Sequence, residues 1–255
     1  MKITSVNNDL VKATAKLLKN KYREETGLFL IEGEKCILEA INANIEIEHI
    51  FVLEGINIQE NLGLEREFPC QVFETTEAVL SKISDAKSAP KMVAVAKQRT
   101  FALKDLRKSK QVVLLEGIKD AGNLGTILRT ACAFGIDAIV LYGDTVDLYN
   151  PKCVRSAVGN LWKIPVIKID SFSELAECFI DFEKVATLPK SDNSVWLNDY
   201  IPNEKVLIMF GSEANGLSED LKKFATKNVT IEMSTEVESL NLSVSAAVFM
   251  YKLKK

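Results

Sequence analysis

Hydrophobic residues in the first 100 positions form short runs that alternate with stretches of helical spacing. Residues 5–23 place apolar side chains at helical intervals opposite a lysine-rich side, which predicts a helix ended by Gly27. Further helical patterns follow at 34–44 and after Thr75 or Thr76. Compact apolar runs predict strands at 27–33, 46–54, 70–76 and 92–98. This alternation predicts a compact α/β domain over residues 1–100.

A polar and basic segment at 101–110 is the expected linker to a second domain over residues 111–255. Beyond it, the apolar runs are continuous and do not alternate with polar residues. Such runs, separated by helical patterns, predict a parallel sheet covered by helices on both faces. Strands are expected at 111–118, 137–143, 164–169, 184–188 and 205–211, and helices at 126–135, 150–161, 171–182, 218–225 and 241–253.

Composition excludes several classes of protein. No window approaches the roughly 18 apolar residues of a membrane-spanning helix, and the first residues lack the apolar core of a secretory signal. The single histidine, His49, lies in a strand-like run, so we expect a structural role and neither a histidine metal site nor a Ser-His-Asp triad. An odd number of widely spaced cysteines favours reduced thiols in a cytoplasm: Cys36, Cys70, Cys132, Cys153 and Cys178.

Charge is unevenly distributed. The formal net charge of −3 does not indicate a nucleic-acid-binding protein. Residues 1–23, however, carry six basic side chains against Asp9, a local net of +5 (6 − 1). A basic N-terminal helix can give a local positive surface for nucleic acid that the summed charge of the whole chain does not reveal. The alternative is an ordinary solvated helix face.

Three stretches of the second domain carry polar residues in positions suited to chemistry. In 117–135, Asn123 follows a buried strand, and Arg129 lies in an otherwise small and apolar helix, where its guanidinium needs an anionic or carbonyl partner. In 208–218, Glu213 lies between glycines. In 231–247, Ser239 and Asn241 precede a packed helix. A structural salt bridge for Arg129 and a helix-terminal charge for Glu213 are the alternatives.

Common catalytic and phosphate-binding loops are missing. Gly122 and Gly125 do not form G-x-G-x-x-G, no G-x-x-x-x-G-K-[ST] occurs, and the loop at Gly211 is not G-x-S-x-G. An unrelated nucleotide-binding α/β enzyme would need such a phosphate loop.

Taken in order, the three stretches read N-x-G-x-x-x-R-T-A-x-x-F-G, G-S-E-x-x-G-L and I-x-M-x-x-x-x-x-S-L-N-x-S-x-A. This set resembles the three motifs of the SpoU/TrmH family of RNA 2'-O-ribose methyltransferases, within the SPOUT class, over roughly residues 110–253. The segment N-P-K-C-V-R at 150–155 is also similar to one in that family. Residues 29–41, FLIEGEKCILEAI, look like the substrate-binding domain often attached to it, an α/β fold shared with ribosomal RNA-binding proteins.

The resemblance implies a C-terminal trefoil knot that binds S-adenosylmethionine, and methyl transfer to a ribose 2'-hydroxyl without a metal. Arg129 would be the essential group, as a base or, since a guanidinium titrates high, as a stabiliser of phosphate or charge. Asn123 would position Arg129 or the ribose, Glu213 would hold the first loop, and Ser239 and Asn241 would shape the surroundings of the hydroxyl. The implied cofactor-binding residues are Thr187, Gly211, Ile231, Met233 and Leu240.

The attached N-terminal domain favours 23S ribosomal RNA as the substrate, and the alternatives are tRNA or a non-catalytic RNA-binding assembly factor. The expected RNA-binding residues are Lys12, Lys16, Lys19, Arg23, Lys152 and Arg155. The helix at 241–253 is apolar on more than one face, which fits a homodimer formed through the C-terminal domain. Glu232 stands where the family commonly has proline, so the cofactor loop would be less rigid.

Overall fold

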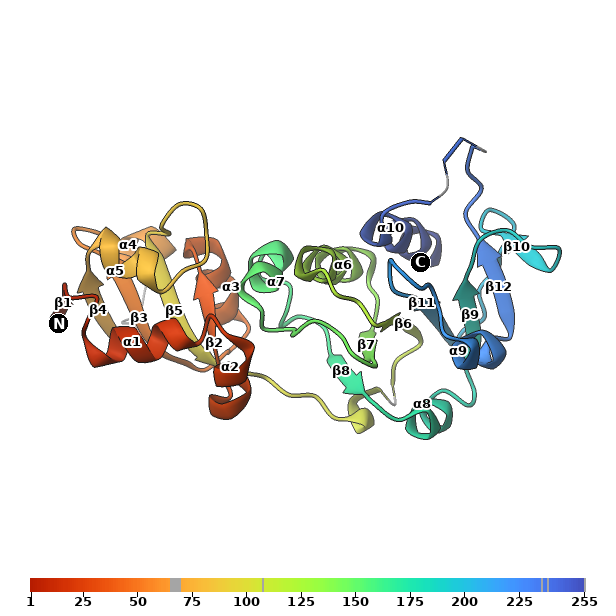
Figure 1. Cartoon of the computed structure of the whole chain (residues 1–255), viewed down its shortest axis with the longest axis horizontal. Helices are drawn as coiled ribbons and strands as arrows, with labels where there is room; N and C mark the ends of the chain where they lie inside the picture. The colour runs from red at the N-terminus through yellow and green to blue at the C-terminus, as the bar shows by residue number, and fades with distance from the viewer. Residues whose placement is uncertain (65–69, 107, 235, 238, 255) are drawn as a thin grey trace. The chain divides into compact units, whose positions relative to one another are not determined.

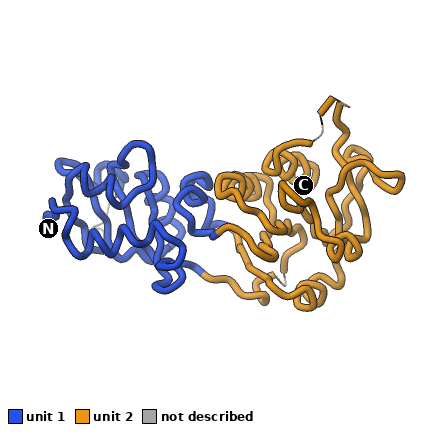
Figure 2. The backbone as a smooth tube through the Cα atoms, in the orientation of Figure 1, with its two compact units in different colours: residues 1–99, 147–163 blue, residues 100–146, 164–255 orange. Residues whose placement is uncertain are grey.

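The computed structural model describes all residues except 65–69, 107, 235, 238 and 255. The chain divides into two compact units, each of which takes residues from separate parts of the sequence (Figure 2). Unit 1 comprises Met1–Arg99 and Asp147–Lys163, and unit 2 comprises Thr100–Val146 and Ile164–Lys255.

Unit 1 is a mixed sheet with helices, in the strand order β1-β4-β3-β5-β2 (Figure 1). Strand β5 is antiparallel to both of its neighbours, whereas β1, β4 and β3 are parallel. The strands are β1 (Lys2–Ile3), β2 (Leu28–Glu32), β3 (Ile47–Leu53), β4 (Gln71–Thr75) and β5 (Met92–Lys97). The helices are α1 (Asp9–Lys16), α2 (Asn20–Thr26), α3 (Glu34–Asn42), α4 (Ile58–Leu62), α5 (Glu77–Lys82) and α7 (Pro151–Ala157).

The N-terminal helical stretch differs from its prediction. Instead of one helix over 5–23, α1 ends at Lys16, and α2 begins at Asn20 after Lys19 adopts an extended backbone. Across this break, the Arg23 Nη1 atom donates to the Leu17 carbonyl at 2.7 Å. Gly27 ends the second helix in the left-handed region, as predicted (φ +68°).

Unit 2 contains a seven-stranded sheet in the order β10-β12-β9-β11-β6-β7-β8, and every pairing in it is parallel. The prediction of a parallel sheet is therefore confirmed. The strands are β6 (Gln111–Glu116), β7 (Ala138–Tyr142), β8 (Val166–Ile169), β9 (Glu183–Thr187), β10 (Ser194–Trp196), β11 (Val206–Phe210) and β12 (Lys227–Thr230). Strands β10 and β12 had no counterpart in the sequence prediction, because each is short and only partly apolar.

Helices cover both faces of this sheet, as the continuous apolar strands predicted (Figure 1). One core cluster joins Leu114 and Met209 of the sheet to Leu175 and Leu221 of two helices. On the opposite face, α10 packs against α6, and the five positions predicted from helical spacing are all buried: Leu242, Ala246, Phe249, Met250 and Leu253. The helices are α6 (Ala121–Phe134), α8 (Phe172–Cys178), α9 (Glu219–Phe224), α10 (Leu242–Leu253) and the short 3-10 helix η1 (Leu103–Leu106).

Two segments depart from the predicted domain boundaries of 1–100, 101–110 and 111–255. The described part of 101–110 packs in unit 2, where Leu106 is buried in the core and Phe101 and Leu103 pack against it. Residues 147–163, expected in the second domain, belong to unit 1. Their polar contacts explain this, because Arg155 pairs with Glu32.

Candidate active site

The candidate site of unit 2 lies at the carboxyl edge of the sheet. Because all strands are parallel, the loops after β6, β9, β11 and β12 leave at this one edge, and β11 lies between β9 and β6. The Glu116 Oε2 atom, at the end of β6, accepts a hydrogen bond from the Ser218 backbone N at 2.7 Å. This bond joins the end of β6 to the segment that follows β11.

The sequence had suggested that Asn123 lies in a loop before the helix. In the structure it lies in the first turn of α6. The helix begins at Ala121, because the Asp120 side chain caps it by accepting from the Asn123 backbone N at 2.8 Å. Asp120 was missed as a functional position, although an aspartate directly before a helical pattern is a recognisable start signal. The cap fixes the first turn and therefore fixes where the Asn123 side chain leaves the helix.

Glu213 lies in a tight loop after β11. Ser212 and Gly216 exchange two backbone hydrogen bonds of 2.9 and 3.2 Å, and Gly216 is in the left-handed region (φ +64°). A Cβ atom at Gly211 would lie 1.9 Å from the Gly216 carbonyl carbon, so only glycine fits there. The loop exposes Glu213 at its turn.

Three predicted site residues, one from each motif, are joined by hydrogen bonds. The Asn123 Nδ2 atom donates to Glu213 Oε1 at 2.8 Å, and Asn241 Nδ2 donates to Asn123 Oδ1 at 3.2 Å. Asn241 also caps α10, where its Oδ1 atom accepts from the Ser243 backbone N at 2.9 Å. Segments up to 118 residues apart therefore form one polar cluster.

Two predicted catalytic residues lie outside this hydrogen-bonded cluster. Arg129 is exposed, and no residue in the described part of the chain forms a hydrogen bond or an ion pair with it. Ser239 is also exposed, in the segment between β12 and α10, and is likewise unbonded among the described residues. The salt bridge that was the alternative explanation for Arg129 is therefore not found within the described chain. An exposed guanidinium can receive an anionic ligand.

The predicted cofactor-binding residues lie at the ends of neighbouring strands and in the segment after β12. Thr187 ends β9, where its hydroxyl donates to the Met209 carbonyl of β11 at 2.9 Å. Ile231 directly follows β12 and is half-buried, as is Leu240, whereas Met233 is 38% exposed. Gly211 directly follows β11, and its backbone packs closely against that of Gly216 and Leu217.

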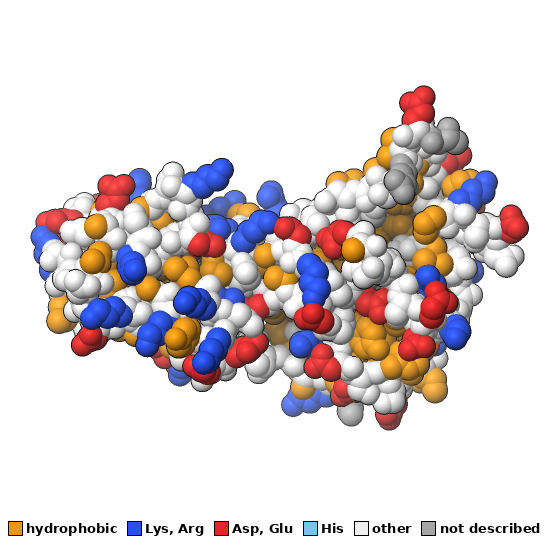
Figure 3. Space-filling model, viewed as in Figure 1, with side chains coloured by type: hydrophobic (Ala, Val, Ile, Leu, Met, Phe, Trp, Pro, Cys, Tyr) orange, Lys and Arg blue, Asp and Glu red, His pale blue; other side chains and the backbone are white. Residues whose placement is uncertain are grey.

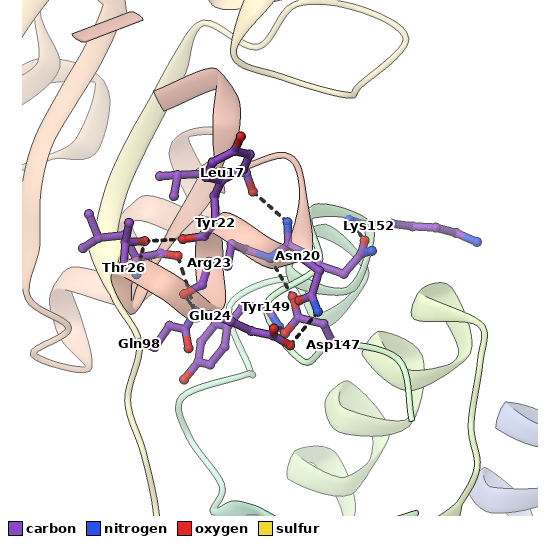
Figure 4. A network of polar contacts seen from close by, with 12 residues as sticks. Leu17, Asn20, Tyr22, Arg23, Glu24, Thr26, Gln98, Asp147, Tyr149 and Lys152 are labelled. Carbon is purple, nitrogen blue, oxygen red and sulfur yellow. Dashed lines mark hydrogen bonds and ion pairs between the residues drawn. The ribbon is translucent and has the colours of Figure 1, made fainter. Parts of the chain in front are cut away.

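The predicted RNA-binding residues divide into exposed and enclosed groups within unit 1. Lys12, Lys16 and Lys19 are exposed, and Lys and Arg side chains recur over α1 and α2 in Figure 3. Lys152 is exposed and extends away from the polar network drawn in Figure 4. These lysines are accessible to a polyanion.

Arg23, by contrast, is only 2% exposed, so its guanidinium is not on the surface of unit 1. Its Nε atom donates to Asp147 Oδ2 at 2.6 Å (Figure 4). Arg155 is half-buried and bridges Glu32, at 3.1 Å, and Asp85. Burial raises the pKa of Glu32, although the hydrogen bond from Ser84 and the charge of Arg155 oppose this shift.

The part of the chain that the structure describes has neither a cluster of metal-ligating side chains nor a helix that could span a membrane. No three His, Cys, Asp or Glu side chains in this part are grouped as metal ligands would be. Its helices are too short or too polar to cross a bilayer.

An open parallel sheet with a polar site at its carboxyl edge defines a class of ligand-binding α/β proteins. Sequence comparison gives the particular family: the chain belongs to the SpoU rRNA Methylase family, which it matches over residues 110–251. Residues 8–94 match the MRM3-like substrate binding domain. The predicted family and the predicted substrate-binding domain are therefore confirmed.

Relatives and solved structures are similar over nearly the whole chain. The 23S rRNA (guanosine(2553)-2'-O)-methyltransferase RlmP of Bacillus subtilis is 31% identical over 252 residues, 99% of this chain and 98% of that protein. A crystal structure of an RNA 2'-O ribose methyltransferase is 32% identical, with a TM-score of 0.86 over 99% and 97% of the two chains. An AdoMet-bound rRNA methyltransferase from Sinorhizobium meliloti is 26% identical, with a TM-score of 0.88 over 99% and 96%.

Proposed function

We propose that this protein is an S-adenosylmethionine-dependent methyltransferase that methylates a ribose 2'-hydroxyl in 23S ribosomal RNA. The observation that carries the proposal is the hydrogen-bonded cluster of Asn123, Glu213 and Asn241, which unites all three family motifs at one edge of the sheet. Family membership and the 2'-O-methyltransferase relative of nearly equal length support the same activity. A non-catalytic RNA-binding protein would not need to keep the polar residues of all three motifs.

Thr187, Gly211, Ile231, Met233 and Leu240 would hold the cofactor, which supplies a methyl group on a positively charged sulfur. The new bond joins that methyl carbon to the ribose 2'-oxygen as the carbon–sulfur bond breaks, so the hydroxyl must lose its proton. Because the sulfur would leave as a neutral thioether, a good leaving group, a metal is not required. The protein would position the oxygen and take up its proton, for which Arg129 is the candidate base.

Arg129 would act on the acceptor RNA. Its exposed guanidinium can hold a substrate phosphate beside the ribose and stabilise developing negative charge. Asn123, Glu213 and Asn241 would fix the surrounding loops, and Ser239 would contribute a hydroxyl to the same region. The lysines of unit 1 would contact RNA phosphates, with Lys12, Lys16, Lys19 and Lys152 as the accessible candidates. Arg23 and Arg155 would instead support the fold of that unit.

We further propose a homodimer formed through α10. Val244, Val248 and Tyr251 are 47%, 38% and 66% exposed on a helix whose other face is buried, which is unusual for apolar side chains in water. The proposal includes a cytoplasmic location, where ribosomal RNA is made, and a trefoil knot in the C-terminal segment as in the family.

Labelling with methyl-tritiated S-adenosylmethionine tests the activity. Purified protein is incubated separately with 23S rRNA, 16S rRNA and tRNA from cells that lack the gene. We expect label in 23S rRNA, recovered as a 2'-O-methylated nucleotide that resists alkaline cleavage. Label in tRNA alone would show that the substrate is tRNA and not 23S rRNA. Label on a base, or cofactor binding without transfer to any fraction, would refute the proposed reaction.

A further inference from the structure

The polar cluster of the site has a fixed hydrogen-bond direction that begins at Ser243. The Asn241 Oδ1 atom accepts from the Ser243 backbone N at 2.9 Å and from the Ser243 hydroxyl at 2.6 Å. A backbone N–H can only donate, so the Asn241 side chain must present its oxygen to Ser243. Its Nδ2 atom therefore faces the other way, towards Asn123.

At the Glu213 end of the cluster, the hydrogen bonds must be donated in the same direction. An ionised carboxylate only accepts, so Asn123 must present Nδ2 to Glu213, and its Oδ1 atom then accepts from Asn241. The requirements of the two ends agree. Donation therefore runs in one direction from Ser243 through Asn241 and Asn123 to Glu213.

We infer that Ser243 is a positioning residue for methyl transfer, whose hydroxyl holds the Asn241 carboxamide in the one orientation that lets Asn123 hold Glu213. The inference rests on the proposed methyltransferase function. Ser243 lies in the first turn of α10 and is half-buried, whereas Asn241 is exposed.

The hydroxyl matters because the link that follows it is weak. The bond from Asn241 to Asn123, at 3.2 Å, is the longest of the cluster, and water can compete for an exposed amide. The backbone N–H of Ser243 caps the helix with or without the hydroxyl. The hydroxyl adds a second, short bond to the same oxygen and thereby restricts rotation of the carboxamide. Within the described residues, Asn123 is the hydrogen-bond partner of Glu213, so a rotated Asn241 would loosen Glu213 as well.

The test compares Ser243→Ala with Ser243→Thr, which keeps a hydroxyl. Ser245→Ala is the matched control, because Ser245 is a half-buried serine of the same helix without a side-chain hydrogen bond to the described residues. Asn241→Asp supplies a background in which the cap survives but donation to Asn123 is lost.

The first readout is independent of activity. The side-chain amide resonances of Asn241 and Asn123 are assigned by their loss in the Asp variants and followed by ¹H–¹⁵N NMR. We expect Ser243→Ala to shift both resonances, while Ser243→Thr and Ser245→Ala leave them in place. Unshifted resonances in Ser243→Ala would overturn the inference even if the protein had no activity on RNA.

The second readout is kinetic. We expect Ser243→Ala to lower kcat about fivefold, the order expected for one hydrogen bond, with cofactor affinity unchanged and the melting temperature lowered by no more than about 4 °C. Ser243→Thr should stay within about twofold of the wild type. In the Asn241→Asp background, Ser243→Ala should cause no further loss. An additive loss in that background, or an alanine variant as fast as the wild type, would contradict the inference. An inactive wild type would instead refute the proposed function.

Discussion

Arg129 is exposed on α6 and has no hydrogen-bond or ion-pair partner in the described part of the chain, so its guanidinium is open to an anionic ligand. We expect Arg129→Ala to bind S-adenosylmethionine nearly as well as the wild type, because the implied cofactor residues lie on other segments. Methyl transfer should fall about 100-fold or more, the loss typical of a group that stabilises developing charge.

Calorimetric titration of the cofactor and single-turnover labelling of 23S rRNA measure these two effects separately. Thr126→Ala is the matched control, because Thr126 is exposed one turn earlier on the same helix. Transfer at the wild-type rate in Arg129→Ala would remove Arg129 from the reaction.

Glu183 is the second residue whose surroundings predict a measurable effect. It is 8% exposed, its Oε2 atom accepts from the Tyr200 hydroxyl at 2.7 Å, and Lys227 lies 2.9 Å from its Oε1 atom. Burial alone would raise the pKa of this carboxyl, but the bonds from Lys227, Tyr200 and the Asn203 backbone N outweigh it and lower the pKa.

The lowered pKa makes the free energy of unfolding depend on pH. The unfolded chain binds a proton at higher pH than the folded protein, so this contribution is complete above the unfolded pKa and is lost as pH falls through the folded one. We expect Glu183→Gln to flatten the fall in stability below about pH 4.5. Urea unfolding at several pH values measures this, with Glu177→Gln, at an exposed position of α8, as the control. A wild-type acid profile in Glu183→Gln would contradict the assignment.

At the scale of elements, α2 and the segment 147–163 are held together by a buried ion pair between Arg23 and Asp147. Removing one partner leaves the other charge partly buried and uncompensated. We therefore expect Arg23→Met to reduce the free energy of unfolding by about 3 kcal/mol or more. Lys21→Met is the control, because its pair with Glu25 is exposed and 3.8 Å long, and should change stability by less than about 0.5 kcal/mol. Equal effects of the two substitutions on urea unfolding would refute this role.

The same elements show what the sequence could and could not predict. Helical spacing correctly placed the buried face of α10, because Leu242, Ala246 and Phe249 follow a local period. The strands of the parallel sheet were predictable for the same reason. The packing of 147–163 with α2 was not predictable, because it involves pairs such as Arg23 with Asp147, 124 residues apart. Periodicity along the chain carries no information about such partners.

The candidate site also has features that the sequence predicted and features that it did not. Motif spacing identified Asn123, Glu213 and Asn241 as site residues, and in the structure they are joined by hydrogen bonds. The contact of the Ser243 hydroxyl with Asn241, from which we infer the direction of their hydrogen bonds, is visible only in three dimensions. For Arg129 and Ser239, the motif predicts a role whose geometry depends on bound RNA and cofactor.

For the whole molecule, the exposed apolar face of α10 predicts the state of assembly. Val248 lies between Val244 and Tyr251 along this face, and Tyr251 contacts Phe134 of α6 edge-on, with ring centroids 5.6 Å apart. A charge at Val248 would have to be buried without a partner in a dimer formed there, but would be solvated in a monomer. We expect Val248→Asp to shift the protein from dimer to monomer in sedimentation analysis while its circular dichroism is unchanged.

Ile180→Asp is the control for this prediction. It places the same charge at a residue of unit 2 that is 77% exposed and should leave the dimer intact. A wild-type protein that sediments as a monomer at micromolar concentration, or a Val248→Asp variant that remains dimeric, would exclude this face as the interface.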